Sequence, residues 1–234
     1  MRFRSKRYKK DAEKTDSNLL TIDEGIKRLK TFSKAKFDQT VDLVCHLGID
    51  ARQADQMLRG SISLPKGIGA SKKVIAFCND ADVEAAKAAG AIEAGADELV
   101  DKVQKGWADF DVAIAHPSLM GKVGKLGRVL GPQGKMPSPK SGTVTPDILT
   151  AVKEYSAGKV EFRNDAGGNL HVVVGKLSFS EDDLKANLMA FIDHVRRMRP
   201  ASAKGQYIKK VCISGTMTPS VHLDVSAVGA EQGA

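Results

Sequence analysis

The sequence contains no apolar run long enough to cross a membrane. Its longest hydrophobic runs are four or five residues, such as Val112–Ala115, whereas a membrane-spanning helix needs roughly 20. The basic N-terminus is not followed by an apolar stretch, so no secretory signal is expected. The three cysteines, Cys45, Cys78 and Cys212, lie far apart and form no CxxC pair. We therefore expect reduced thiols in the cytoplasm, no metal site and no membrane partner.

Motifs for nucleotide binding and catalysis are missing as well. Gly67–Lys72 has lysine where the dinucleotide fingerprint needs its third glycine, and it precedes a predicted strand instead of following one. Around Gly134 and Lys135, the earlier glycine and the following Ser or Thr of a phosphate-binding loop are absent. No nucleophile stands beside a histidine in a recognisable catalytic arrangement. We therefore expect no cofactor and no enzymatic activity, with a nucleotide- or sugar-phosphate-binding enzyme as the alternative interpretation.

Acidic residues are absent from three stretches of the chain. Residues 1–10, 121–140 and 196–210 contain 17 basic side chains and no acidic one, and the remaining residues carry a net charge of −9. The total charge of +8 is thus concentrated in three segments on a mildly acidic body. This distribution favours a polyanionic partner, in particular nucleic acid. A solvated lysine-rich surface is the alternative for any one stretch.

The N-terminal part of the chain has the pattern of a helix followed by a half-buried strand. Residues 1–17 are expected to form a loose basic arm. Thr21 and Glu24 form a capping box, which predicts the start of a short amphipathic helix. Residues 37–49 then alternate between apolar and polar side chains, as a strand of an antiparallel sheet with one buried face does.

The C-terminal part returns to this antiparallel pattern. Strands are predicted at 160–163 and 170–176, and the glycine-containing turn between them indicates a hairpin. Ser180 is placed to cap a helix that runs toward residue 198 with one apolar face. Strands at 207–213 and 221–225 are expected to pair with each other. Because each outer segment alone is too small for a confident core, we expect the two to fold together.

The middle of the chain has a different pattern. Apolar strands at 73–78 and 111–115 alternate with helices at 80–89, after Pro117 and after Thr145, with Pro146 at the first helical position. Alternating strands and helices predict a parallel sheet covered on both faces.

The predicted fold is therefore an α+β domain I, built from both chain ends, with an inserted α/β domain II of a Rossmann-like, three-layer type. Residues 1–67 and 159–234 form domain I in this interpretation, and residues 68–158 form domain II.

The segment 121–144 combines glycines, basic side chains and apolar anchors. Five glycines fall within fourteen residues, between Gly121 and Gly134, and two prolines follow. Glycine lets a partner approach the backbone closely, and the cations can meet phosphates. A tight turn with incidental lysines is the alternative interpretation.

This segment resembles the signature of the bacterial family of large-subunit ribosomal protein one. Shorter matches occur in the order of that family, from about residue 20 to 225, at Lys36–Asp38, Leu64–Gly67, Lys159–Asp165, His171, Gly175–Phe179 and Ser214–Met217. The long glycine-containing signature is the specific part of the resemblance.

The resemblance implies a structural RNA-binding protein of the ribosome, in the cytoplasm. Its implied main partner is large-subunit ribosomal RNA in the mobile stalk beside the tRNA exit site, with other ribosomal components nearby. It also implies contact with exit-site tRNA, a contribution to release of deacylated tRNA, and repression of its own operon through the messenger RNA leader. Two domains joined by hinges near Pro65–Gly69 and Gly158 are implied, and a monomer is expected off the ribosome.

Carried over position by position, the resemblance implies an RNA surface on domain I. Its residues would be Lys36, Phe37, Thr40, Arg163, His171, Lys176, Ser178, Thr216 and Met217. Such hydroxyl and cationic groups suit A-form RNA, which presents sugar 2′-hydroxyls and phosphates. A secondary contact is expected from Lys122, Lys125, Arg128, Lys135 and Lys140 of domain II. Phe37 also shares parity with the buried side of its predicted strand, so core packing is its alternative role.

Two departures from the family pattern affect these expectations. The family usually has glycine after Thr-Met, whereas Thr218 and Pro219 follow here, which bears on the backbone path of that loop. Lys66 and Ile68 stand where the family more often has His and Thr, which bears on the hinge. An architectural DNA-binding protein is the third interpretation, and competition between duplex DNA and structured RNA distinguishes it.

Overall fold

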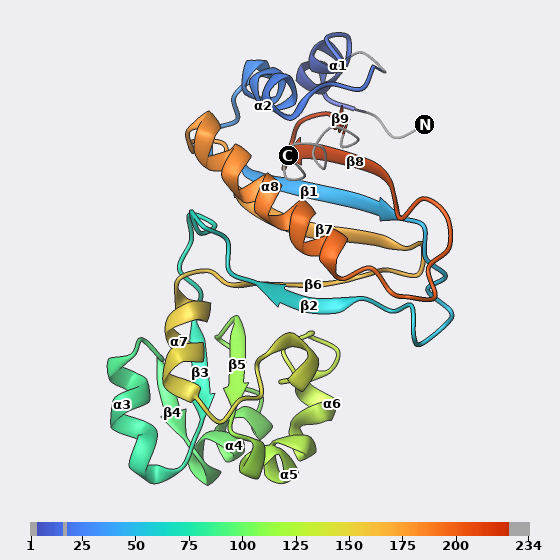
Figure 1. Cartoon of the computed structure of the whole chain (residues 1–234). Coiled ribbons are helices and arrows are strands. Elements are labelled where there is room, and N and C mark those ends of the chain that lie inside the picture. The colour runs from blue at the N-terminus through green and yellow to red at the C-terminus, as the bar shows by residue number, and fades with distance from the viewer. Residues whose placement is uncertain (1–3, 16–17, 225–234) are drawn as a thin grey trace. The chain divides into compact units, whose positions relative to one another are not determined.

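The computed structural model describes residues 4–15 and 18–224 (Figure 1). The end of the predicted strand at residue 225, the chain after it and Arg2 of the basic arm lie outside the described residues. Contacts divide the chain into two compact units. Unit 1 comprises Met1–Gly69 with Phe162–Ala234, and unit 2 comprises Ala70–Glu161. The domain boundaries that we predict from the sequence, after residues 67 and 158, concern separately folding domains and stay predictions.

Unit 1 contains a four-stranded antiparallel sheet. Its strands follow the order β7 (Asn169–Lys176), β1 (Thr40–Leu47), β8 (Ile208–Gly215) and β9 (Val221–Leu223). In β1 every second side chain is buried, as the alternation predicts. Register shifts between Val41 and Asp42, and between His46 and Leu47, mark irregularities toward β7 and β8.

Helices cover one face of this sheet, and Figure 1 shows α8 running across it. The helix α2 (Ile22–Thr31) begins with the predicted capping box of Thr21 and Glu24. The longer α8 (Glu181–Arg197) is capped by Ser180, also as predicted. We call the opposite side of the sheet the outer face. Its half-buried or exposed side chains are Thr40, Asp42, Val44, His46, His171, Val173, Lys210, Cys212 and Ser214.

The expectation of a loose N-terminal arm is wrong for residues 6–12. They form α1 (Lys6–Ala12), capped by Ser5. The reason is Asp11, which is buried and accepts hydrogen bonds from the hydroxyl of Ser33, at 2.7 Å, and from its N–H, at 3.2 Å. A buried carboxylate with these partners fixes the helix to the loop after α2.

The predicted hairpin of residues 160–163 and 170–176 is also wrong. β6 (Val160–Arg163) pairs with β2 (Arg59–Ile62), a strand that the sequence analysis missed, and β7 pairs with β1. Only one bridge, Asn164 to Leu170, joins the two predicted partners. The Asn164 side chain accepts the N–H of Leu58 at 2.8 Å, which directs the chain before it toward β2.

Unit 2 is a parallel sheet with helices on both faces. The strand order is β4 (Glu93–Gly95), β3 (Val74–Phe77), β5 (Val112–Ala115). One buried cluster joins the sheet to α3 (Val83–Ala88) and α7 (Ile148–Ser156), and the other joins it to α4 (Asp97–Gln104), α5 (Met120–Val123) and α6 (Gly127–Leu130). Short 3-10 turns lie at Asp80–Asp82, Pro117–Leu119, Gly124–Leu126 and Pro139–Ser141.

The start of α7 differs from the prediction. Pro146 precedes the helix, and Asp147 is the N-cap, whose side chain accepts the N–H of Thr150 at 3.1 Å. Because the Asp147 carboxylate satisfies this early helical N–H, the helix begins two residues later than predicted, at Ile148. Across residues 4–15 and 18–224, no helix is long and apolar enough to cross a membrane. Cys45, Cys78 and Cys212 are free thiols.

Candidate nucleic-acid interface

Three segments that are distant in sequence meet at one end of the sheet in unit 1. They are residues 36–40 at the start of β1, 176–178 at the end of β7 and 216–217 after β8. Thr40 pairs with Lys176 across the β1–β7 ladder. The N–H of Thr216 donates to the Thr40 carbonyl at 3.0 Å. Antiparallel pairing thus brings seven of the nine predicted RNA-contacting residues together.

Hydroxyl and ammonium groups form a connected cluster at this end. The ammonium of Lys176 donates to the hydroxyl oxygen of Thr40 at 2.8 Å. The N–H of Thr40 donates to the hydroxyl oxygen of Thr216 at 3.1 Å. A hydroxyl has one donor and two acceptor positions, and an ammonium has three donors, so each group keeps capacity for a further partner.

Two residues that the sequence analysis did not select hold these segments in place. The carboxylate of Asp38 accepts the hydroxyl of Ser178 at 2.7 Å and its N–H at 3.2 Å. The side-chain oxygen of the buried Gln39 accepts the N–H of Met217 at 2.9 Å. Sequence position gave no signal for these roles, because both partners lie more than a hundred residues away.

Two large apolar side chains project from this cluster. Phe37 is 50% exposed and Met217 is 51% exposed. Phe37 lines a cavity of about 540 Å³ together with Lys30, Lys34 and Ser178. The core-packing role considered for Phe37 is therefore wrong. Because β1 begins only at Thr40, the alternation of that strand does not extend to Phe37.

Thr218, where this sequence departs from the family pattern, stabilises the turn after β8. Thr218 is buried, and its hydroxyl oxygen accepts the N–H of Gly215 at 2.8 Å. Its own N–H donates to the Gly215 carbonyl at 3.1 Å. These bonds close the turn that presents Thr216 and Met217, so Thr218 supports the loop from beneath and does not project from it.

His171 and Arg163 lie apart from this cluster. His171 is exposed on the outer face, opposite Val44, with Nε2 3.7 Å from a carboxylate oxygen of Asp165. Arg163 is exposed at the end of β6, outside the four-stranded sheet. On the outer face, burial raises the pKa of Asp42, and the charges of His171 and Lys176 oppose that rise.

The predicted secondary contact lies in unit 2, on α5 and α6 and on the segment that follows α6 to the turn Pro139–Ser141. Apolar side chains of this segment are buried, whereas Gly121, Gly124 and Gly127 face open space. Lys122 forms an ion pair with Asp97 at 2.7 Å. Lys135 donates to the Ala108 carbonyl at 2.9 Å. Lys125, Arg128 and Lys140 are exposed, and no ion pair to them occurs within the described part of the chain.

The N-terminal helix α1 adds a contact to this loop that was not predicted. The guanidinium of Arg7 donates to the Met217 carbonyl at 3.2 Å. The basic residues of the stretch 1–10 indicated a polyanionic partner. Because a loose arm was expected there, no fixed contact to the loop was predicted. Arg7 adds a cation beside the loop of Thr216 and Met217.

Comparisons with known proteins identify related sequences. The profile of the ribosomal protein L1p/L10e family matches residues 29–219. A large ribosomal subunit protein uL1 from Nocardioides sp. is 52% identical over 222 residues, which are 94% of this chain and 92% of the relative. Proteins of the same name from Kosmotoga olearia and Thermobifida fusca are 50% and 48% identical, over 94% and 96% of this chain and 96% of each relative.

Proposed function

Because the chain belongs to the ribosomal protein L1p/L10e family, we propose that it binds large-subunit ribosomal RNA through the cluster at the end of the unit 1 sheet. The chain is a structural protein of the large ribosomal subunit, located with the ribosome in the cytoplasm, and is not an enzyme. The proposal concerns what the chain contacts there: the RNA of the mobile stalk beside the tRNA exit site.

The convergence of Lys36, Thr40 and Lys176 with Thr216 and Met217 carries this proposal. A-form RNA hides its major groove, so proteins meet its 2′-hydroxyls and phosphates. The Thr40 hydroxyl can donate to a sugar hydroxyl, the Thr216 hydroxyl keeps an acceptor position for one, and the lysines can meet phosphates. The exposed Phe37 and Met217 provide apolar surface for a ribose or an unstacked base.

The remaining roles belong to the same proposal. The chain would contribute to release of deacylated tRNA from the exit site and repress its own operon by binding a similar structure in the messenger RNA leader. Lys125, Arg128 and Lys140 would supply the secondary contact. Lys122 and Lys135 fit it less well, because each already has a partner inside unit 2. We expect a monomer off the ribosome.

Units 1 and 2 would correspond to the two domains, with unit 2 as the inserted three-layer α/β domain. The segments near Pro65–Gly69 and Gly158 would be the hinges. Positive φ angles of 62° at Gly67, 71° at Gly69 and 103° at Gly158 suit glycine at those places.

Binding of this RNA is expected to weaken steeply with salt. Each phosphate neutralised by Lys or Arg releases counterions and adds roughly 0.7–0.9 to the slope of log affinity against log salt. The affinity for the RNA that copurifies with the chain should be measured between about 50 and 200 mM salt, with duplex DNA as competitor. Several phosphate contacts predict a slope of at least about three. A flat response, or equal competition by DNA, would refute the proposal.

Truncating the exposed loop is expected to weaken RNA binding more than it lowers stability. The double variant Thr216→Val and Met217→Ala removes one hydroxyl and one exposed apolar side chain. Affinity for the copurifying RNA should fall about tenfold. The unfolding free energy should fall by only about 1 kcal/mol, because the two bonds of the Thr216 hydroxyl, from the Thr40 N–H and to the Thr40 carbonyl, are both exposed. Met217→Ala alone should leave the melting temperature unchanged. Unaltered affinity in both variants would remove this loop from the interface.

A further inference from the structure

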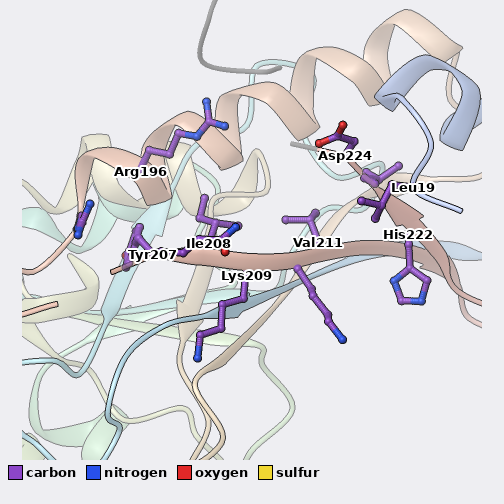
Figure 2. Close-up of a pocket in the computed structure, with 12 residues that line it drawn as sticks. Leu19, Arg196, Tyr207, Ile208, Lys209, Val211, His222 and Asp224 are labelled. Atoms are coloured by element: carbon purple, nitrogen blue, oxygen red, sulfur yellow. The ribbon is translucent and has the colours of Figure 1, made fainter. Parts of the chain in front are cut away.

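A second concave surface lies in unit 1 at the other end of β8. This cavity of about 790 Å³ is shown in Figure 2, and we call it the basic groove. It is lined by Leu19, Arg196, Arg199, Gln206, Tyr207, Ile208, Lys209, Lys210, Val211, His222, Leu223 and Asp224. None of the residues assigned to the RNA cluster belongs to it.

Cations dominate the lining of the basic groove. Four of its side chains are Lys or Arg, and a single one, Asp224, is acidic. Figure 2 shows Arg196 on one side of the β8 ribbon and Lys209 extending from the other. Lys209 and Lys210 are exposed, and neither has an ion-pair partner within residues 4–15 and 18–224. These residues belong to the acid-free stretch 196–210, which the proposed function has not used.

One wall of the groove is held in place by hydrogen bonds and by packing against a ring. Arg199 is fixed by donating to the carbonyls of Ala203 and Gly205, at 2.9 and 3.0 Å, and its guanidinium lies 5.9 Å from the centre of the Tyr207 ring. Tyr207 is only 7% exposed, and its hydroxyl has no hydrogen-bond partner in the described chain. Arg199 and the buried Tyr207 ring therefore give the groove a fixed wall beside the exposed lysines.

The groove lies on the same strand as the proposed RNA cluster. Strand β8 (Ile208–Gly215) begins at the groove and ends at the loop of Thr216 and Met217, a span of about 25 Å. Lys210 is on the outer face, as is the hydroxyl of Ser214 nearer the cluster. A backbone that leaves the cluster along this strand therefore reaches Lys210 on the outer face, and Lys209 follows it at the register shift between β8 and β1.

We propose that the basic groove holds a further stretch of the RNA backbone, continuous with the RNA bound at the cluster. This inference rests on the proposed function, because it extends the same RNA. Phosphates would meet Lys209 and Lys210, which are exposed and have no ion-pair partner among the described residues. The net positive lining favours a polyanion, and Leu19, 65% exposed at the rim, offers apolar surface to a sugar or base.

The test replaces Lys209→Gln and Lys210→Gln together, because both side chains are exposed and the substitutions leave the fold intact. The matched control is Lys87→Gln with Lys105→Gln, two exposed lysines of unit 2 that remove the same charge. The probe is the copurifying RNA after nuclease trimming. The groove variant should bind it about tenfold more weakly, and its salt slope should fall by about 1.4 to 1.8, since two phosphate contacts are lost. Its nuclease-protected fragment should be shorter.

The outcomes separate this inference from the proposed function. If the unaltered chain shows no salt-dependent RNA binding, the proposed function fails and the inference with it. If the unaltered chain binds steeply but the groove variant matches the lysine control in affinity and slope, only the groove inference is overturned. Binding of poly-glutamate that is lost in the groove variant, with RNA binding unchanged, would assign the groove to an acidic peptide and would also overturn it.

Discussion

Replacing Asn187 with leucine is expected to lower the unfolding free energy of unit 1 by about 3–5 kcal/mol. Asn187 lies on α8 and is 0% exposed. Its side-chain oxygen accepts the N–H of Lys66 at 3.0 Å, and its amide donates to the carbonyls of Gly67 and Val174 at 2.9 and 2.8 Å. Leucine has similar volume but leaves these three backbone groups without their partner, at about 1–3 kcal/mol for each group that stays buried. Three such groups sum to about 3–9 kcal/mol. The lower part of this sum applies, because Lys66 is exposed and its N–H can bond to water instead.

The control for this prediction is Gln206→Leu, which also converts an amide to leucine but at an exposed position of unit 1. It should change stability by no more than about 0.5 kcal/mol. Hydrogen exchange of β8 amides reports unit 1, whereas fluorescence of Trp107, the one tryptophan, reports unit 2. A loss below about 1 kcal/mol for Asn187→Leu would show that these bonds do not stabilise the fold. We expect Trp107 to report no change.

Local signals predicted much of the fold. The capping box of Thr21 and Glu24, the cap at Ser180 and the alternation of β1 each depend on neighbouring residues, and each is present in the structure. Alternating apolar strands and helices likewise predicted the strands β3 and β5 of unit 2. Such patterns are readable because the period of side chains follows directly from backbone geometry.

Pairing partners were harder to predict than elements. The hairpin prediction failed because Asn164 bonds to Leu58, more than a hundred residues earlier, and β6 joins β2. The looseness expected of the N-terminal arm failed because Asp11 is buried against Ser33. Both errors come from hydrogen bonds between segments that are separated in the sequence, which no local pattern encodes.

The candidate site divides in the same way. Composition alone indicated a polyanionic partner, and the family resemblance selected the residues at the end of the sheet. The supporting roles of Asp38, Gln39 and Thr218 were beyond prediction, because they follow from where the three segments meet. Phe37 was ambiguous for a similar reason, since its exposure depends on β1 beginning at Thr40.

Lys176→Glu is expected to weaken RNA binding at least a hundredfold. Lys176 donates to the Thr40 hydroxyl at 2.8 Å, and its charge acts on the nearby Asp42. Charge reversal removes one charge-assisted contact to phosphate, worth roughly 1.5–3 kcal/mol. It also places a second carboxylate near Asp42, which repels the RNA backbone. Together these changes exceed the roughly 2.8 kcal/mol that a hundredfold loss requires.

The stability of Lys176→Glu should fall by about 1–2 kcal/mol, because one partly exposed hydrogen bond is lost and the new carboxylate repels Asp42. Lys105→Glu, which makes the same charge change at an exposed site of unit 2, is the matched control and should weaken RNA binding less than threefold. Lys176→Arg keeps the charge and should retain most of the affinity. Equal losses for Lys176→Glu and Lys105→Glu would mean that net charge alone attracts the RNA. The cluster at the end of the sheet would then have no specific role, since only a local contact makes one lysine matter more than another.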